Sequence, residues 1–439
     1  MGAWKRFALA ALAAFFVLPA VARAESEVDI LLDKLVERKV ISGVDAGLIR
    51  REINETKEVR YKQMAKEIVP DSARNWKWSG DLRLRDEMRN RQGTGNDSHR
   101  QRIRFRFGSE GKVSDTLKAK FRIATGTGSD FETGSATDNS DISRADPIST
   151  NDTFDDFFRK KPIVLDLANV EWSPEVPGVT KFSVVAGIIE NPMWTVTPMV
   201  WDGDLSWDGA AIRVTEEVGP ISFFSNGGAF ALDSDESEPA ALYVAQGGAS
   251  IKFFPDASDE FTKNLKLTTA LAYHDYVNVA NSAKAGTDPL VREADNTTAT
   301  DFNQFNPSIE LASQYKEVPF SIFGDWVHNI SASSAGNDGF AIGAKVGKAS
   351  VPFSATKGWE AGYMFERLER DAAFDEFVDS DFGGGGTNRR GNVIWANLAV
   401  LKNSTLGLKY FFKQNTLRNF GTTQEFREDR AQLDWVTKF

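Results

Sequence analysis

The sequence of 439 residues contains no cysteine and only three histidines, His99, His274 and His328. The absence of cysteine excludes disulfides, thiolate metal sites, haem attachment through cysteine and thiol nucleophiles. The histidines lie far apart, and no serine stands in the glycine-flanked motif of serine hydrolases. Because a hydrolase needs a base beside its nucleophile, we predict no enzyme, no cofactor and no metal centre.

Long apolar runs are also missing. After residue 24 no stretch of eighteen apolar residues occurs, so the sequence predicts no transmembrane helix. The apolar run Phe7–Val17 is shorter, follows Lys5 and Arg6, and precedes the small-x-small site Ala22–Ala24. This order predicts a secretory signal peptide at residues 1–24.

Basic residues are fewer than acidic ones, 52 against 62. The formal net charge is −10, the sequence pI is about 5.1 and the mean hydropathy is −0.34. An acidic chain is a poor partner for nucleic acid, which we therefore exclude as a ligand. The low hydropathy fits a soluble secreted protein, and it also fits a membrane β-barrel, in which only every second residue faces lipid.

Residues 25–70 have a helical period. The apolar positions that recur at this spacing are Leu31, Leu32, Leu35, Val36, Leu48, Ile49 and Ile53. Residues 40–43 interrupt the pattern, and Ser42 with Asp45 three residues later resembles a capping box. We predict a helical hairpin or a short coiled coil, located in the periplasm and followed by a linker at Val69–Pro70.

From residue 77 to residue 439 the period changes to two. In the first three predicted strands, apolar residues such as Leu82, Phe105 and Phe121 alternate with basic ones. The basic residues are Arg83, Arg85, Arg89, Arg102, Arg104, Arg106, Lys118, Lys120 and Arg122. Such charged second faces cannot line a dry core, but they fit a sheet between lipid and water. We predict that these nine side chains line a pore.

The same alternation continues to the C-terminus and predicts about sixteen strands, an even number as bacterial barrels require. The parity is ambiguous in two of them, 163–172 and 391–401. Long connections such as 125–162 and 369–390 alternate with short ones such as Lys402–Asn403. We therefore predict an all-β, antiparallel transmembrane barrel over residues 77–439.

The longest connection, 125–162, is a candidate constriction loop, because long ordered loops are usually functional. Its candidate acidic residues are Asp130, Glu132, Asp138, Asp141, Asp152, Asp155 and Asp156. Infolding and a solvated surface loop remain equal alternatives. Asp202–Asp208 and Asp379–Asp381 resemble the start of a calcium loop, but Arg213 stands where a bidentate glutamate is required, which favours Asx turns.

The chain ends on an alternating strand with Trp435 on its apolar face and Phe439 as the last residue. This ending resembles the C-terminal signal of outer-membrane proteins that the barrel-assembly machinery recognises. Together with the signal peptide it predicts location in the outer membrane, with the bilayer and lipopolysaccharide as surroundings.

Three stretches resemble the bacterial "putative porin" family: Ala186–Trp194 running on to Trp201–Leu205, Phe323–Asn329, and Asp379–Asn388. The resemblance covers nearly the whole mature chain and implies passive diffusion of small hydrophilic solutes or ions through a water-filled barrel. Two alternatives remain open. One is a structural barrel that tethers the envelope through its N-terminal helices, and the other is a sheath for a periplasmic electron carrier. Association of several copies also stays open.

Overall fold

The computed structural model describes residues 27–52, 75–92, 97–126, 146–154, 156–158, 160–234, 239–279, 301–332, 336–354, 357–417 and 427–439. The chain divides into two units, Met1–Arg74 and Asn75–Phe439. Within the described ranges, no helix is long and apolar enough to cross a membrane.

The described part of the first unit contains two helices, α2 (Glu27–Glu37) and a second one over residues 43–52. Ser42 caps the second helix: its hydroxyl oxygen accepts from the Asp45 N–H at 3.1 Å, and its own N–H donates to Asp45 Oδ2 at 3.2 Å. Arg50 pairs with Asp33 across the two helices at 2.6 Å. The predicted capping box is therefore confirmed, and the predicted helices are present over residues 27–52; residues 53–70 of the predicted segment lie outside the described residues.

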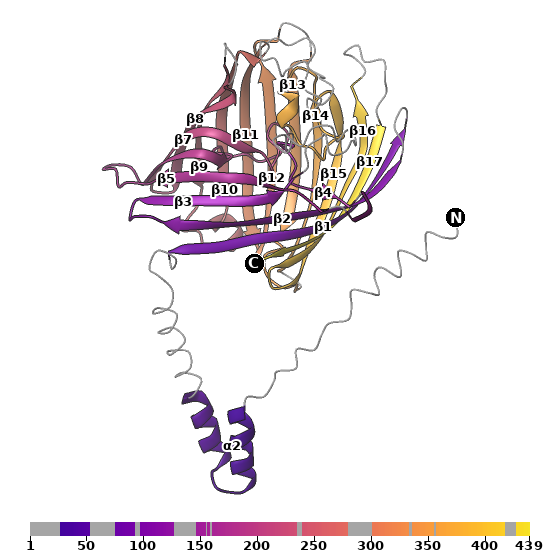
Figure 1. The fold of residues 1–439 in the computed structure, drawn as a ribbon. Coiled ribbons are helices and arrows are strands. Elements are labelled where there is room, and N and C mark those ends of the chain that lie inside the picture. Colours follow the sequence, from indigo (N-terminus) through magenta and orange to yellow (C-terminus); the bar gives the residue numbers. More distant parts are fainter. Residues whose placement is uncertain are drawn as a thin grey trace. The chain divides into compact units, whose positions relative to one another are not determined.

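The second unit is a closed antiparallel barrel (Figure 1). Its wall strands are β1 (Trp76–Gln92), β2 (Ser98–Lys112), β3 (Leu117–Thr125), β5 (Ile163–Trp172), β6 (Lys181–Glu190), β7 (Ser206–Val218), β8 (Ile221–Asp233), β9 (Ala240–Lys252), β10 (Lys266–Val277), β11 (Phe302–Tyr315), β12 (Val318–Asn329), β13 (Asp338–Gly347), β14 (Trp359–Leu368), β15 (Arg389–Leu401), β16 (Ser404–Thr416) and β17 (Arg427–Lys438).

Each wall strand pairs with its neighbour in sequence, and β17 pairs with β1 from Asp81↔Lys438 to Gln92↔Arg427. The seventeenth strand of the sheet, β4 (Asp152–Thr153), is only two residues long and pairs with β2 beyond the end of β3. The remaining sixteen strands close the wall, which confirms the predicted fold class. In the described parts of the connections lie the short helices η3 (Asp156–Phe158), α5 (Glu260–Lys263) and η5 (Asp375–Phe377).

The alternation in the sequence places apolar side chains outside the barrel. Large apolar residues on the outward face are exposed, among them Leu271, Ile322, Ile342 and Leu408. Their sequence neighbours Ala270, Ser321 and Ala341 point inward and are buried. This division is typical of a barrel whose outer face contacts lipid.

β-Bulges explain the two strands of ambiguous parity. Arg122 pairs with Leu167 but Ile123 pairs with Leu165, so Asp166 is an extra residue in β5. Leu165 and Val170 consequently both face outward. In a regular strand, residues separated by an odd number of positions would face opposite sides of the sheet. In β15 the register shifts between Arg390 and Asn392 and again between Ala399 and Leu401.

The connections differ in length at the two ends of the barrel. At one end, the short-turn end, Lys316 and Glu317 link β11 to β12, both with positive φ, as in a two-residue hairpin turn. At the other, the long-loop end, residues 191–205 and 369–388 connect neighbouring strands. These two long connections carry the buried residues described next.

Candidate functional site inside the barrel

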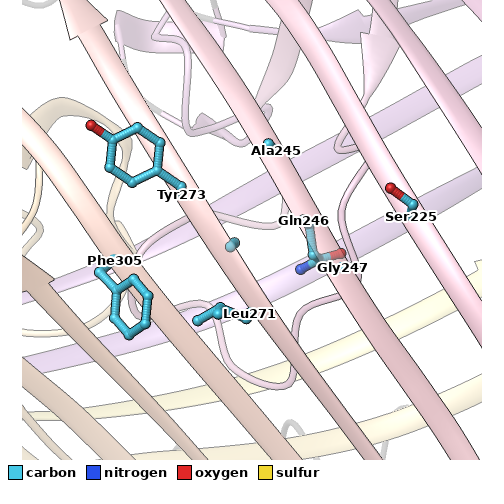
Figure 2. Close-up of a pocket in the computed structure, with 8 residues that line it drawn as sticks. Ser225, Ala245, Gln246, Gly247, Leu271, Tyr273 and Phe305 are labelled. Carbon is cyan, nitrogen blue, oxygen red and sulfur yellow. The ribbon is translucent and has the colours of Figure 1, made fainter.

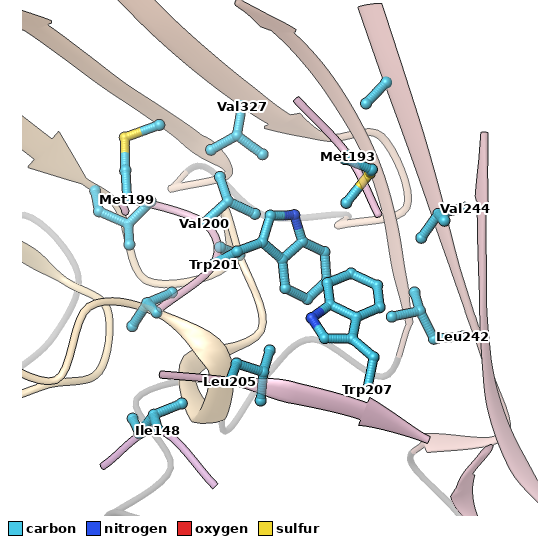
Figure 3. Packing of buried hydrophobic residues seen from close by; sticks show 14 of the residues in the cluster. Ile148, Met193, Met199, Val200, Trp201, Leu205, Trp207, Leu242, Val244 and Val327 are labelled. Atoms are coloured by element: carbon cyan, nitrogen blue, oxygen red, sulfur yellow. The ribbon is translucent and has the colours of Figure 1, made fainter. Parts of the chain in front are cut away.

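Residues 191–205, which we call the first inner loop, fold into the barrel and pack on its inner wall. Met199, Val200 and Trp201 are almost completely buried. Trp201 lies 4.4 Å, between ring centroids, from Trp207 of β7, and Figure 3 shows the two rings side by side. Apolar burial therefore holds this loop inside the barrel.

Residues 369–388, the second inner loop, pack beside the first. Phe374 stacks on Tyr276 of β10 at 5.3 Å, and Phe377 stacks on Trp201 at 6.0 Å. Asn329 of β12 donates from Nδ2 to the carbonyl oxygen of Asp371 at 2.9 Å. The two loops and the wall thus share one buried cluster.

The predicted basic residues meet carboxylates of the wall and of the first inner loop. Arg104 pairs with Asp81 of β1 at 2.8 Å and with Asp204 at 3.2 Å. Arg106 contacts the same two carboxylates at 2.7 and 3.4 Å, and Arg83 lies 3.9 Å from Asp204. Although burial opposes ionisation, Arg104, Arg83 and Arg106 lower the pKa of Asp204 below its ordinary value.

A second group of charges joins the wall to the second inner loop. Arg85 pairs with Asp381 at 3.0 Å and with Asp434 of β17 at 2.7 Å. Arg430 of β17 also reaches Asp381, at 3.3 Å. Burial would raise the pKa of Asp381, but Arg85, Lys409 and Arg430 hold it well below its usual range.

Two predicted residues contact other groups. Arg89 donates to Glu87 at 2.8 Å, and Arg102 donates to the carbonyl oxygen of Asn151 at 3.1 Å. Asn151 also accepts from Arg83 at 2.5 Å. Residues 149–151 are buried, so the described end of the predicted constriction loop lies against the basic wall.

The basic residues of β3 are more exposed than those of β1 and β2. Their ion pairs are Lys118 with Glu110 at 3.2 Å, Lys120 with Glu190 at 2.8 Å, and Arg122 with Asp166 and Glu190. The side chain of Lys118 is 49% exposed and that of Lys120 is 31% exposed, against 3% for Arg85. Exposure therefore increases toward the short-turn end.

Most of the acids predicted for a constriction cannot be placed. Asp130, Glu132, Asp138, Asp141 and Asp155 lie outside the described residues, as does the side chain of Asp156.

The remaining candidate, Asp152, is buried and pairs with Lys161 at 3.1 Å. The acids that face the predicted basic wall include Asp81, Asp204, Asp381 and Asp434, which sequence reasoning did not select. The inward parity of Asp434 was readable from the outward parity of Leu433, but the positions of the two loop residues were not.

The Asx-turn interpretation of the two acidic motifs is confirmed. The N–H of Asp204 donates to Asp202 Oδ1 at 2.8 Å, and the N–H of Asp381 donates to Asp379 Oδ1 at 2.9 Å. Across the part of the chain that the structure describes, no three histidine or acidic side chains form a metal-binding group.

The C-terminal residue closes the barrel at the short-turn end. Phe439 exchanges two backbone hydrogen bonds with Gly80, at 2.9 and 3.0 Å, and its ring stacks on Phe105 at 6.4 Å. A Cβ at position 80 would lie 2.7 Å from the Phe439 ring, so glycine leaves room for that ring. Trp435 donates from its indole N–H to Thr437 at 3.0 Å.

A separate depression of about 410 Å³ lies on the wall at β8–β11. Figure 2 shows Leu271, Tyr273 and Phe305 beside the small residues Ala245 and Gly247. Leu271 and Tyr273 are exposed and point outward. This depression is therefore on the outer face and is no part of the inner site.

Comparison with known proteins gives a family and a fold. The family model described as "Putative porin" matches residues 88–318 and 314–439. The structure of Pseudomonas putida OprB at high pH is similar with a TM-score of 0.52 and 12% identity, covering 83% of this chain and 94% of that one. A mutant porin of Rh. blastica has a TM-score of 0.42 and 11% identity, covering 83% and 100%. No curated protein matches the chain.

Proposed function

Since the chain belongs to the "Putative porin" family, we propose that it is an outer-membrane channel through which small hydrophilic solutes or ions diffuse passively. The observation that carries the proposal is the exposed charged surface inside a closed barrel, formed by Lys118, Lys120 and Glu190. Charged side chains within a barrel require water around them, and water inside a membrane barrel is a diffusion path.

The proposal includes an orientation. Bacterial barrels have short periplasmic turns and longer extracellular loops. We therefore place the short-turn end and residues 25–70 in the periplasm, after removal of residues 1–24. Lipid and lipopolysaccharide then surround the wall, and Trp435 and Phe439 serve the assembly machinery.

The test is recording from the purified full-length mature protein in planar lipid bilayers. If the protein is a channel, we expect stepwise conductance that scales with salt concentration. We also expect uptake of small sugars into liposomes that contain the protein. A folded barrel with neither property would contradict the proposal.

One observation favours a second candidate, a structural barrel that tethers the envelope. The inner loops cover part of the inner wall, where the side chains of Arg85 and Arg104 are only 3% and 9% exposed. A sealed barrel would show no conductance, while deletion of residues 26–66 would weaken attachment of the outer membrane to the cell. The same recordings therefore separate the two functions.

A further inference from the structure

The two inner loops carry the same short motif, Asp202-Gly203-Asp204 and Asp379-Ser380-Asp381. In each motif the first aspartate accepts the N–H of the second, which forms an Asx turn. The second aspartate, Asp204 or Asp381, is then free to pair with wall arginines. The two turns are therefore built alike, although 177 positions separate their first residues in sequence.

The two turns are also joined to each other. The N–H of Ser380 donates to Asp202 Oδ2 at 2.8 Å, and the N–H of Asp202 donates to the carbonyl oxygen of Phe377 at 2.7 Å. Trp201 stacks on Phe377 at 6.0 Å. We call this contact, made by Asp202, Phe377, Asp379 and Ser380, the loop clasp.

Negatively charged groups surround Asp202 in the loop clasp. Asp202 is 8% exposed. The carboxylates of Asp379 and Asp204 oppose its ionisation, whereas the N–H groups of Ser380 and Asp204, which donate to its two carboxylate oxygens, act in the other direction. Burial, with Asp379 and Asp204 nearby, raises the pKa of Asp202 to about 8. Arg104 and Arg106 pair with Asp204, the second aspartate of the same motif.

Asp379 is surrounded by charges from several elements. Burial raises its pKa, Lys409 of β16 and Arg430 of β17 act against this, and Asp381 of its own loop adds to it. The carboxylate of Glu366 on β14 also acts on this region. Ionising Asp202 therefore adds a negative charge beside carboxylates in a buried contact.

We propose that the loop clasp is a proton-controlled latch that sets the width of the channel. With Asp202 uncharged, the two inner loops stay joined and the passage is narrow. When Asp202 ionises, its proton passes to solvent and the loops separate. The latch rests on the proposed channel function, which it extends by a mode of regulation.

The pH window follows from linkage. In separated loops Asp202 is solvated and has the ordinary aspartate pKa of about 3.9, whereas in the clasp the pKa is about 8. The clasp is fully favoured below the first value and is weakened as pH rises toward the second. Between them, each pH unit changes the ratio of separated to joined loops about tenfold. Above pH 8 no further change is expected from this group.

The test is single-channel recording of the full-length mature protein at pH 5, 6, 7, 8 and 9. We expect the time spent in a wider conductance level to rise between pH 5 and 8 and then to level off. Asp202→Asn keeps the group uncharged, and Asp379→Asn removes the neighbouring charge while it preserves the Oδ1 acceptor. Both variants should flatten the response. Asp115→Asn, at a fully exposed turn carboxylate, should retain it.

The outcomes are distinct. A wild-type conductance that does not depend on pH, or variants at 202 and 379 that follow the wild-type curve, would overturn the latch but leave the channel function intact. Absence of conductance at every pH would contradict the channel function itself. Heat-modifiable migration on gels verifies that each variant has folded, and either asparagine variant alone suffices to decide.

Discussion

At the scale of single residues, the wall residues Lys118 and Lys120 have more access to water than Arg85 or Arg104. The double variant Lys118→Glu, Lys120→Glu places two carboxylates on an exposed inner surface, beside Glu110 and Glu190. The ratio of cation to anion permeability should rise by roughly twofold or more. Reversal potentials in a salt gradient measure it, and Lys402→Glu, in the short turn between β15 and β16, is the control. An unchanged reversal potential would show that these lysines do not line the conducting path.

Arg104 should behave differently, because it is buried between Asp81 and Asp204. Removing one partner of a buried ion pair costs roughly 3–5 kcal/mol. Arg104→Met should therefore release the first inner loop, lower the temperature at which the barrel unfolds on gels and increase the conductance. Arg89→Met, which breaks an equally buried pair with Glu87 of the wall, is the comparison variant. Equal conductance in both variants would contradict a loop-fastening role for Arg104.

At the scale of secondary structure, the closing pair of strands depends on the last residue. The Phe439 ring covers Gly80 and stacks on Phe105. Phe439→Ala exposes this seam and should reduce the amount of barrel inserted in the membrane, while each surviving channel conducts normally. Phe439→Trp keeps an aromatic ring and should assemble better than the alanine variant. Wild-type levels of inserted barrel in Phe439→Ala would mean that the terminal ring is dispensable.

At the scale of the whole molecule, the two units are predicted to be independent in folding. The helices of residues 27–52 have their own cap and their own ion pair, Asp33 with Arg50. The wall closes without them through β1 and β17. Deleting residues 26–66 should leave a heat-modifiable barrel with unchanged conductance. Failure of that deletion to assemble would show that the helices are needed for barrel formation.

The sequence alone was sufficient to predict the strands of the barrel wall and which of their side chains face inward. A period of two makes outward and inward residues distinguishable in β1, β2 and β3, because strand side chains alternate between faces. Lipid on one side and water on the other make the two sets chemically different, so the strand number and the inward direction of Arg83 and Arg104 were predictable. Only at the bulges, such as Asp166 in β5, did the alternation fail, since one extra residue reverses the faces.

Only the tertiary structure decided what faces that wall. Loops have no period, so nothing in the sequence indicated that Asp204 and Asp381 lie opposite the arginines, or that the two Asx turns meet through Asp202 and Ser380. These contacts join residues far apart in the chain, and they depend on how apolar groups such as Trp201 pack inside a closed barrel. Local spacing carries no information about that packing, which is why the wall was predictable and the site within it was not.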